Sequence, residues 1–138
     1  CQYYAFFFGA ADRASHPELW KRLVEEFGPD RKARGLHPEI HPSNAFVGNY
    51  LRMELLARDG RAAQVLKESR SFFGYMAERT GTLWENVDAS ASCNHGFASH
   101  VAVTLLRDVA GIARVDPRSR TVRLSAPDVP LDRCEAEV

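Results

Sequence analysis

The sequence predicts a mainly helical fold that passes into a short β segment toward its C-terminal end. Apolar residues recur at intervals of three and four through four stretches between residues 2 and 111, which is the periodicity of amphipathic helices. After Gly111 the pattern changes to an alternation of apolar and polar residues, which is typical of strands. The 138 residues are 45% apolar, enough to bury a core, so we expect a helical domain over residues 1–111 and the start of a β domain over residues 112–138.

The first helical signals lie before residue 29. Residues 2–10 are aromatic and apolar and fit the last turns of a buried helix. Ser15 and Glu18 then have the Ser-x-x-Glu spacing of a capping box, in which each side chain bonds the backbone amide of the other residue. Leucines and Phe27 follow on one face, and Gly28-Pro29 predicts the end of this short amphipathic helix.

Two longer helices are predicted on either side of Asp59-Gly60. Turn residues between positions 29 and 42 indicate a loop, and Pro42-Ser43-Asn44 predicts the start of the helix that follows it. A third helix begins after Gly60 and closes near Thr80-Gly81, since glycine is common just past a helix C-terminus. Because the turn between the two helices is so short, we expect them to lie antiparallel as a helical hairpin.

Residues 81–95 interrupt this pattern, because they are rich in small polar residues and show no periodicity. Irregular segments held between regular elements often carry binding or catalytic groups. A fourth helix is predicted from Phe97 to Val109. Beyond Gly111 we predict strands at residues 112–115 and 121–124, joined by a turn at 116–119, and a third strand at 131–138.

Composition and charge limit the classes of function. The 18 basic and 18 acidic residues cancel and are interspersed, so we expect neither a nucleic-acid nor a membrane partner. No apolar run is long enough for a membrane span, and no signal peptide is recognisable. Three widely spaced cysteines favour a reducing compartment such as the cytoplasm, and the localisation stays open. Since the chain begins without Met and stops within a predicted strand, we expect a piece of a longer polypeptide.

Two dipeptides in the irregular segment are candidates for a site. Trp84 precedes Glu85, and an indole face beside a carboxylate suits a sugar ring, whose apolar face stacks on aromatic side chains. The plainer interpretation is a surface glutamate after a core tryptophan. Asn94 and His95 offer an amide and an imidazole to sugar hydroxyls, and the alternative is that Asn94 or Ser92 does no more than cap the fourth helix.

We expect no metal and no cofactor. Cys93, His95 and His100 lack the fourth ligand that a structural zinc site needs. The His37-Pro38-Glu39-Ile40-His41 segment is not a metalloprotease motif, because its proline prevents the helix that would align two imidazoles. No nucleophile elbow, phosphate-binding loop or dinucleotide fingerprint is present, so acyl, phosphoryl and hydride transfer have no support.

Four stretches together resemble the C-terminal part of the catalytic domain of α-L-rhamnosidases, glycoside hydrolase family 78. They are Tyr3-Tyr4-Ala5, Phe46-Val47-Gly48, Gly81-Thr82-Leu83-Trp84-Glu85, and Asn94-His95 continuing through Phe97 to Val109-Ala110-Gly111-Ile112. Their order and distances also fit, and the resemblance covers essentially the whole chain. It implies a partial (α/α)6 six-hairpin barrel, of which this chain supplies the last hairpins, followed by the beginning of a C-terminal β-sandwich.

The resemblance also implies roles for single residues. Glu85 corresponds to the general base that activates water in inverting hydrolysis of a terminal α-L-rhamnosyl or similar bond. His95 corresponds to a residue that binds the terminal sugar, and Trp84 and Asn94 to substrate-binding neighbours. The general acid, which inverting hydrolysis places about 6.5–9.5 Å from the base, would lie upstream of Cys1, so the isolated fragment is expected to be inactive.

Two departures and two alternatives follow from the same comparison. Asn86 and Val87 stand where many family members have an arginine and a tryptophan, which leaves the sugar preference open, and Glu39 and Asp88 are the nearest substitutes for the missing acid. The implied partners are a carbohydrate substrate and the rest of the parent polypeptide, or a second copy that covers exposed barrel faces. The alternatives are a non-catalytic helical module that binds carbohydrate or protein, and a structural unit without a cleft around Glu85.

Overall fold

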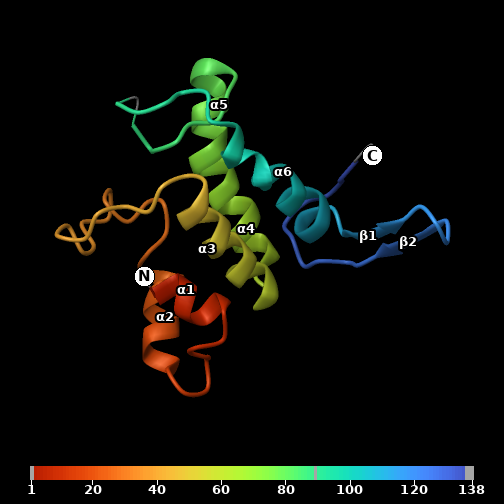
Figure 1. Cartoon of the computed structure of the whole chain (residues 1–138), viewed down its shortest axis with the longest axis horizontal. Helices are drawn as coiled ribbons and strands as arrows, with labels where there is room; N and C mark the ends of the chain where they lie inside the picture. The colour runs from red at the N-terminus through yellow and green to blue at the C-terminus, as the bar shows by residue number, and fades with distance from the viewer. Residues whose placement is uncertain (1, 89, 136–138) are drawn as a thin grey trace.

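The computed structural model describes residues 2–88 and 90–135 and confirms a mainly helical chain with one small sheet (Figure 1). The α-helices of the described residues are α1 (Gln2–Phe7), α2 (Pro17–Glu25), α3 (Val47–Arg58), α4 (Ala62–Ser69), α5 (Tyr75–Thr80) and α6 (His100–Thr104). The strands are β1 (Ile112–Asp116) and β2 (Thr121–Leu124). No helix among the described residues is long and apolar enough to cross a membrane.

The third and fourth predicted helices are present, and each contains a π-helical turn that was not predicted. The turn Arg70–Gly74 joins α4 to α5, so residues 62–80 run as one rod. A 3₁₀ turn, Gly96–Ser99, leads into α6, and the π turn Leu105–Val109 follows it. A π turn adds a residue to one helical turn, and apolar spacing of three and four does not report so local a change.

The predicted hairpin of α3 and α4 is confirmed, and α1 packs on the same helix α3. The helix predicted to open at Pro42-Ser43-Asn44 begins at Val47 with Phe46 as its N-cap, and the Asn44 Oδ1 accepts hydrogen bonds from the amides of Val47 and Gly48 at 3.0 and 2.9 Å. Ser43 lies so close to Gly48 that a Cβ on this glycine would come within 3.0 Å of the serine side chain. The loop before α3 is therefore held tightly against the first turn of the helix.

The predicted capping box of α2 is wrong. The helix begins at Pro17 with His16 as its N-cap, and no side chain caps it. Ser15 instead bonds to Asp12 through both its amide, at 2.7 Å, and its hydroxyl, at 2.9 Å. Since proline is favoured in the first turn of a helix, Pro17 sets the start one residue later than the Ser-x-x-Glu spacing assumes.

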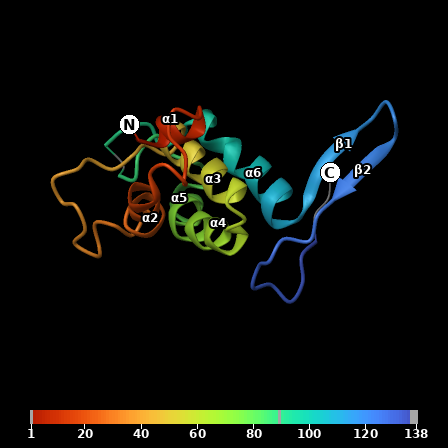
Figure 2. The ribbon, with the colours of Figure 1, turned by 90° about the horizontal axis from the view of Figure 1, so that it is seen from below.

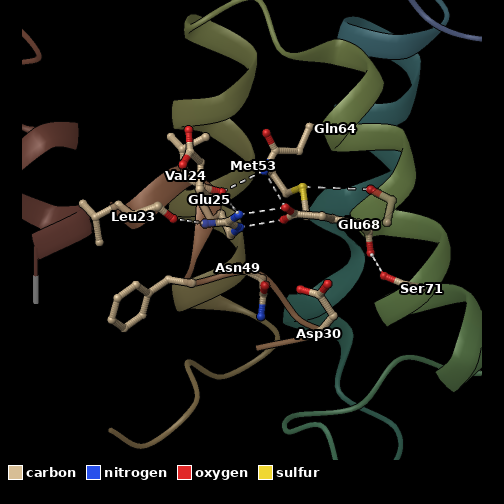
Figure 3. Close-up of polar contacts among 12 residues, drawn as sticks. Leu23, Val24, Glu25, Asp30, Asn49, Met53, Gln64, Glu68 and Ser71 are labelled. Atoms are coloured by element: carbon tan, nitrogen blue, oxygen red, sulfur yellow. Dashed lines mark hydrogen bonds and ion pairs between the residues drawn. The ribbon is translucent and has the colours of Figure 1, made fainter. Parts of the chain in front are cut away.

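The core lies between the α3–α4 hairpin, α5 and the segments that pack on them. Its largest completely buried side chains belong to Met53, Leu56, Val65, Met76 and Thr104. A buried ion pair lies at one side of this core, where Arg52 of α3 meets Glu68 of α4 (Figure 3). Their side chains are 2% and 9% exposed.

All five N–H groups of the Arg52 guanidinium have an acceptor. Two bond the Glu68 carboxylate at 2.6 and 2.7 Å, and the others bond the Tyr3 hydroxyl at 3.0 Å and the carbonyls of Leu23 and Val24 at 2.5 and 2.9 Å. Those two carbonyls belong to the last turn of α2, where backbone acceptors have no partner within the helix. Arg52 therefore joins α1, α2, α3 and α4 through one side chain.

The β segment after residue 111 is confirmed as a hairpin of two strands. β1 and β2 pair antiparallel, with Asp116 opposite Thr121. Figures 1 and 2 show the hairpin projecting from the helical part, and every residue of β2 is exposed. The third predicted strand is wrong over residues 131–135, which are irregular, and residues 136–138 lie outside the described part.

Candidate functional site

The irregular segment 81–95 folds back on itself and brings Glu85 and His95 onto neighbouring backbone stretches. The Glu85 amide donates to the Ser92 carbonyl at 2.8 Å, and the His95 amide donates to the Leu83 carbonyl at 2.8 Å. Between these two bonds lie one residue on the first stretch and two on the second, as in a β-bulge. The two candidate dipeptides therefore belong to one local structure.

A second set of contacts fastens this structure to the loop before α3. The Ala45 amide donates to the Glu85 carbonyl at 2.9 Å, and the rings of Phe46 and His95 lie 4.7 Å apart. Ala45 is completely buried, and its neighbours are fixed by the hydrogen bonds of the Asn44 side chain. The backbone of Glu85 is thus positioned by α3 as well as by its own loop.

The Glu85 side chain is half-buried, and within the described residues its carboxylate has no hydrogen-bond or ion-pair partner. By contrast, the carboxylates of Glu54, Asp59 and Glu68 each form an ion pair with an arginine. Asn94 is exposed, and its backbone N–H donates to the Ser92 hydroxyl oxygen at 3.4 Å. The helical segment after it has His95 as N-cap without a side-chain bond, so neither Asn94 nor Ser92 caps it.

Trp84 is a core residue, with 3% of its surface exposed. Its Nε1 donates to the Thr80 hydroxyl at 2.8 Å, and the Tyr75 ring meets it at a centroid distance of 5.7 Å. The indole therefore presents no open face to a sugar in this structure. Trp84 acts on Glu85 only by position, because its buried ring anchors the backbone next to Glu85.

His95 is half-buried between two aromatic rings. Its ring lies 4.7 Å from that of Phe46 and 5.5 Å from that of Phe97. Its Nε2 is buried and has no hydrogen-bond partner in residues 2–88 and 90–135. An imidazole nitrogen left in this state can form a hydrogen bond with a ligand hydroxyl that reaches it.

A cavity of about 600 Å³ borders the same region. Val87, two residues after Glu85, contributes to its wall together with Phe46, but Glu85 and His95 do not line it. Most of the wall comes from α1, the start of α3 and the loop between α2 and α3, which contributes Arg31. The sequence does not reveal this cavity, because its residues are scattered over several segments without a common motif.

Asp88, in the segment 81–95, interacts electrostatically with two residues of the loop 29–42, Lys32 and His41. Hydrogen bonds from Ser90 lower the pKa of the Asp88 carboxyl group, and the positive charges of Lys32 and His41 act in the same direction. Lys32 and His41 both line the cavity. Glu39, the other substitute considered for a general acid, is exposed and lies 3.8 Å from His37.

The burial of His100 leads us to expect that the protein loses stability in acid. Burial lowers the pKa of its imidazole below the ordinary 6.5, although the Phe97 carbonyl and Glu54 oppose the shift. As the pH falls below 6.5, His100 is protonated in the unfolded chain before it is protonated in the folded one. The stability that comes from burying the neutral imidazole is therefore fully present above pH 6.5 and decreases below it. We expect His100→Gln to flatten the fall in unfolding free energy between about pH 7.5 and pH 5.5.

Chemical denaturation at the two pH values measures this effect. The matched control is His16→Gln, which makes the same substitution at an exposed histidine. Equal pH slopes for the unmodified chain and His100→Gln would show that His100 titrates alike in both states.

No group of three or more metal-ligating side chains gathers within the described residues. Comparisons of the chain with family models, with curated proteins and with solved structures give no match. The resemblance to family 78 therefore stays a prediction, and the geometry around Glu85 is what supports or opposes it.

Proposed function

We propose that the chain is the C-terminal part of the catalytic domain of an inverting glycoside hydrolase similar to α-L-rhamnosidases, with Glu85 as the general base. The observation that carries this proposal is the Glu85 carboxylate itself. It is half-buried, it has no partner in the described residues, and its backbone is bonded on both sides, to Ser92 and Ala45.

These features fit the requirements of a general base. The oxygens of a carboxylate that is paired with an arginine are already occupied, whereas the Glu85 oxygens have no partner in the described residues and can accept a hydrogen bond from a water. Catalysis also needs the base held within hydrogen-bond reach of its water, which a fixed backbone favours. The general acid of the proposed reaction would come from upstream hairpins, at the separation that leaves room for this water.

Exposed apolar side chains support the proposal of a partial six-hairpin barrel. Phe8, just after α1, is 72% exposed, and Phe97 and Val103 near α6 are 79% and 58% exposed. Large exposed apolar surface usually marks an interface. We propose that the remaining hairpins of the parent polypeptide cover these side chains, and that a second copy takes their place in the isolated chain.

The test is Glu85→Gln in the parent polypeptide, with p-nitrophenyl α-L-rhamnoside as substrate. We expect kcat to fall by at least about a hundredfold, the lower range for the loss of a general acid or base. Glu78→Gln is the matched control, because Glu78 is exposed on α5, close to the same segment, and should leave kcat unchanged.

A readout specific to the base separates chemistry from damage to the fold. Azide added to Glu85→Ala should restore turnover and give a glycosyl azide of inverted configuration, since an external nucleophile then replaces the activated water. Near-normal hydrolysis by Glu85→Gln would end the assignment.

A non-catalytic binding module is the second candidate, and one observation favours it. Within the described residues, no Asp or Glu lines the cavity of about 600 Å³, so any ligand held there lies away from a catalytic carboxylate. In that case Glu85→Gln would leave ligand binding unchanged and no hydrolysis would be found for the parent.

A further inference from the structure

Arg31 is a buried cation that has no carboxylate partner among the described residues. It is 5% exposed, yet no Asp or Glu lies within ion-pair distance of it in that part of the chain. Its Nη2 donates to the Ile40 carbonyl at 2.5 Å, its guanidinium lies 5.0 Å from the centre of the Phe27 ring, and its Nη1 is buried without an acceptor. Arg52, buried to a similar degree, is paired with Glu68.

This difference matters because an unpaired buried charge is unfavourable. Removing a guanidinium from water requires compensating acceptors, and Arg52 has five where Arg31 has one carbonyl and an aromatic face. An anion beside Arg31 would supply what the protein does not. The position of Arg31 in the wall of the cavity makes this possible.

Within the described part of the chain, the rest of the cavity wall holds one further cationic side chain, Lys32, together with neutral polar and apolar residues. Lys32 and His41 line it, and no acidic side chain of the described residues does. Val47 and Gly48 bring the N-terminal end of α3 to the wall, and the helix dipole adds positive potential there, although Asn44 already bonds both amides. The apolar part of the wall includes Phe27, Phe46, Leu51 and Phe72.

We propose that this cavity binds a small organic carboxylate, with the Arg31 guanidinium pairing with the carboxylate and the aromatic wall holding an apolar body. The Nη1 of Arg31 carries two N–H groups without an acceptor, which a carboxylate can take up, whereas a phosphate dianion gains nothing from the aromatic wall. The volume of about 600 Å³ is within the range of small-molecule sites. The inference stands on the cavity alone and does not depend on the role proposed for Glu85.

Calorimetric titration of the chain with 3-phenylpropionate tests this inference, with the neutral 3-phenylpropionamide as its isostere. Because the two ligands share one apolar body, their affinities differ only through the head group, which is an anionic acceptor in one and a neutral amide in the other. We expect the carboxylate to bind at least about tenfold more tightly, the lower end of what a charge-assisted hydrogen bond contributes. Equal affinities, no binding of either ligand, or tighter binding of inorganic phosphate would each overturn the proposal.

Two variants locate the effect at Arg31. Arg31→Gln should bind the carboxylate and the amide equally. Arg79→Gln is the matched control, since Arg79 also lies over an aromatic ring, at 4.5 Å from the centre of Tyr75, but is exposed and outside the cavity. Full discrimination by Arg31→Gln would overturn the assignment of Arg31. If Arg31→Gln does not fold, the two ligands on the unmodified chain still decide the proposal.

Discussion

Arg52→Met is expected to lower the free energy of unfolding by about 3–5 kcal/mol, which is the usual effect of removing one partner from a buried ion pair. Burial works against the charge, but the hydrogen bonds with Glu68 and Tyr3 hold the pKa of Arg52 above its ordinary value. The substitution leaves the Glu68 carboxylate in the core with only Gln64 as a donor, at 2.8 Å. It also removes the donors for the Leu23 and Val24 carbonyls, of which Val24 keeps Gln64 at 2.9 Å.

Chemical denaturation measures this loss, and Arg58→Met is the matched control. Arg58 lies on the same helix and over the Phe7 ring at 4.2 Å, but half of its side chain is exposed. Exposed arginines of this kind contribute about 0–1 kcal/mol. A loss below about 1 kcal/mol for Arg52→Met would contradict the central role of the ion pair.

The double variant Arg52→Met, Glu68→Met separates the pair from its neighbours. If the single substitutions act mainly by leaving a buried charge unpaired, the double variant should lose less stability than the two losses added together. A residual loss is still expected, because the α2 carbonyls at Leu23 and Val24 no longer meet the guanidinium (Figure 3).

The contrast between α3 and its ion pair shows what the sequence predicts and what it does not. Local signals located the turn at Asp59-Gly60 and brought the start of α3 to within a few residues of Val47, because these features depend on neighbouring residues. The pairing of Arg52 with Glu68 joins residues on two helices, and each residue alone resembles a solvated charge. Burial of both depends on how α2 packs across the hairpin, which no spacing within one helix reports.

The candidate site, too, was predicted from the sequence only in part. The irregular composition of residues 81–95 predicted a site-bearing segment, and the structure brings Leu83–Glu85 and Ser92–His95 together within it. Trp84 was singled out for its indole, which is instead buried beneath the segment. Arg31 was not singled out, because its burial arises from the loop that returns to Ile40, and loop conformation is poorly encoded in single residues.

After Arg52→Met, we expect Gly111→Ala to cause the largest loss in the free energy of unfolding. Gly111 has φ +79°, which is unfavourable for a residue with a side chain, and an added Cβ would come within 3.0 Å of the Ser125 carbonyl oxygen. The Ser125 amide donates to the Gly111 carbonyl at 2.8 Å, so the segment after β2 is docked on this glycine. We expect about 1–2 kcal/mol from the backbone strain and about 1–3 kcal/mol more from the clash.

Gly60→Ala isolates the first of these two effects, because Gly60 has φ +71° and nothing lies within 4 Å of an added Cβ. Both variants carry the same strain, and only Gly111→Ala must also displace a backbone carbonyl. Denaturation should therefore show a larger loss for Gly111→Ala, and hydrogen exchange should show faster exchange of the Ser125 amide in that variant alone. Equal losses, with the Ser125 amide equally protected in both, would mean that the hairpin is held to the helices by contacts other than this junction.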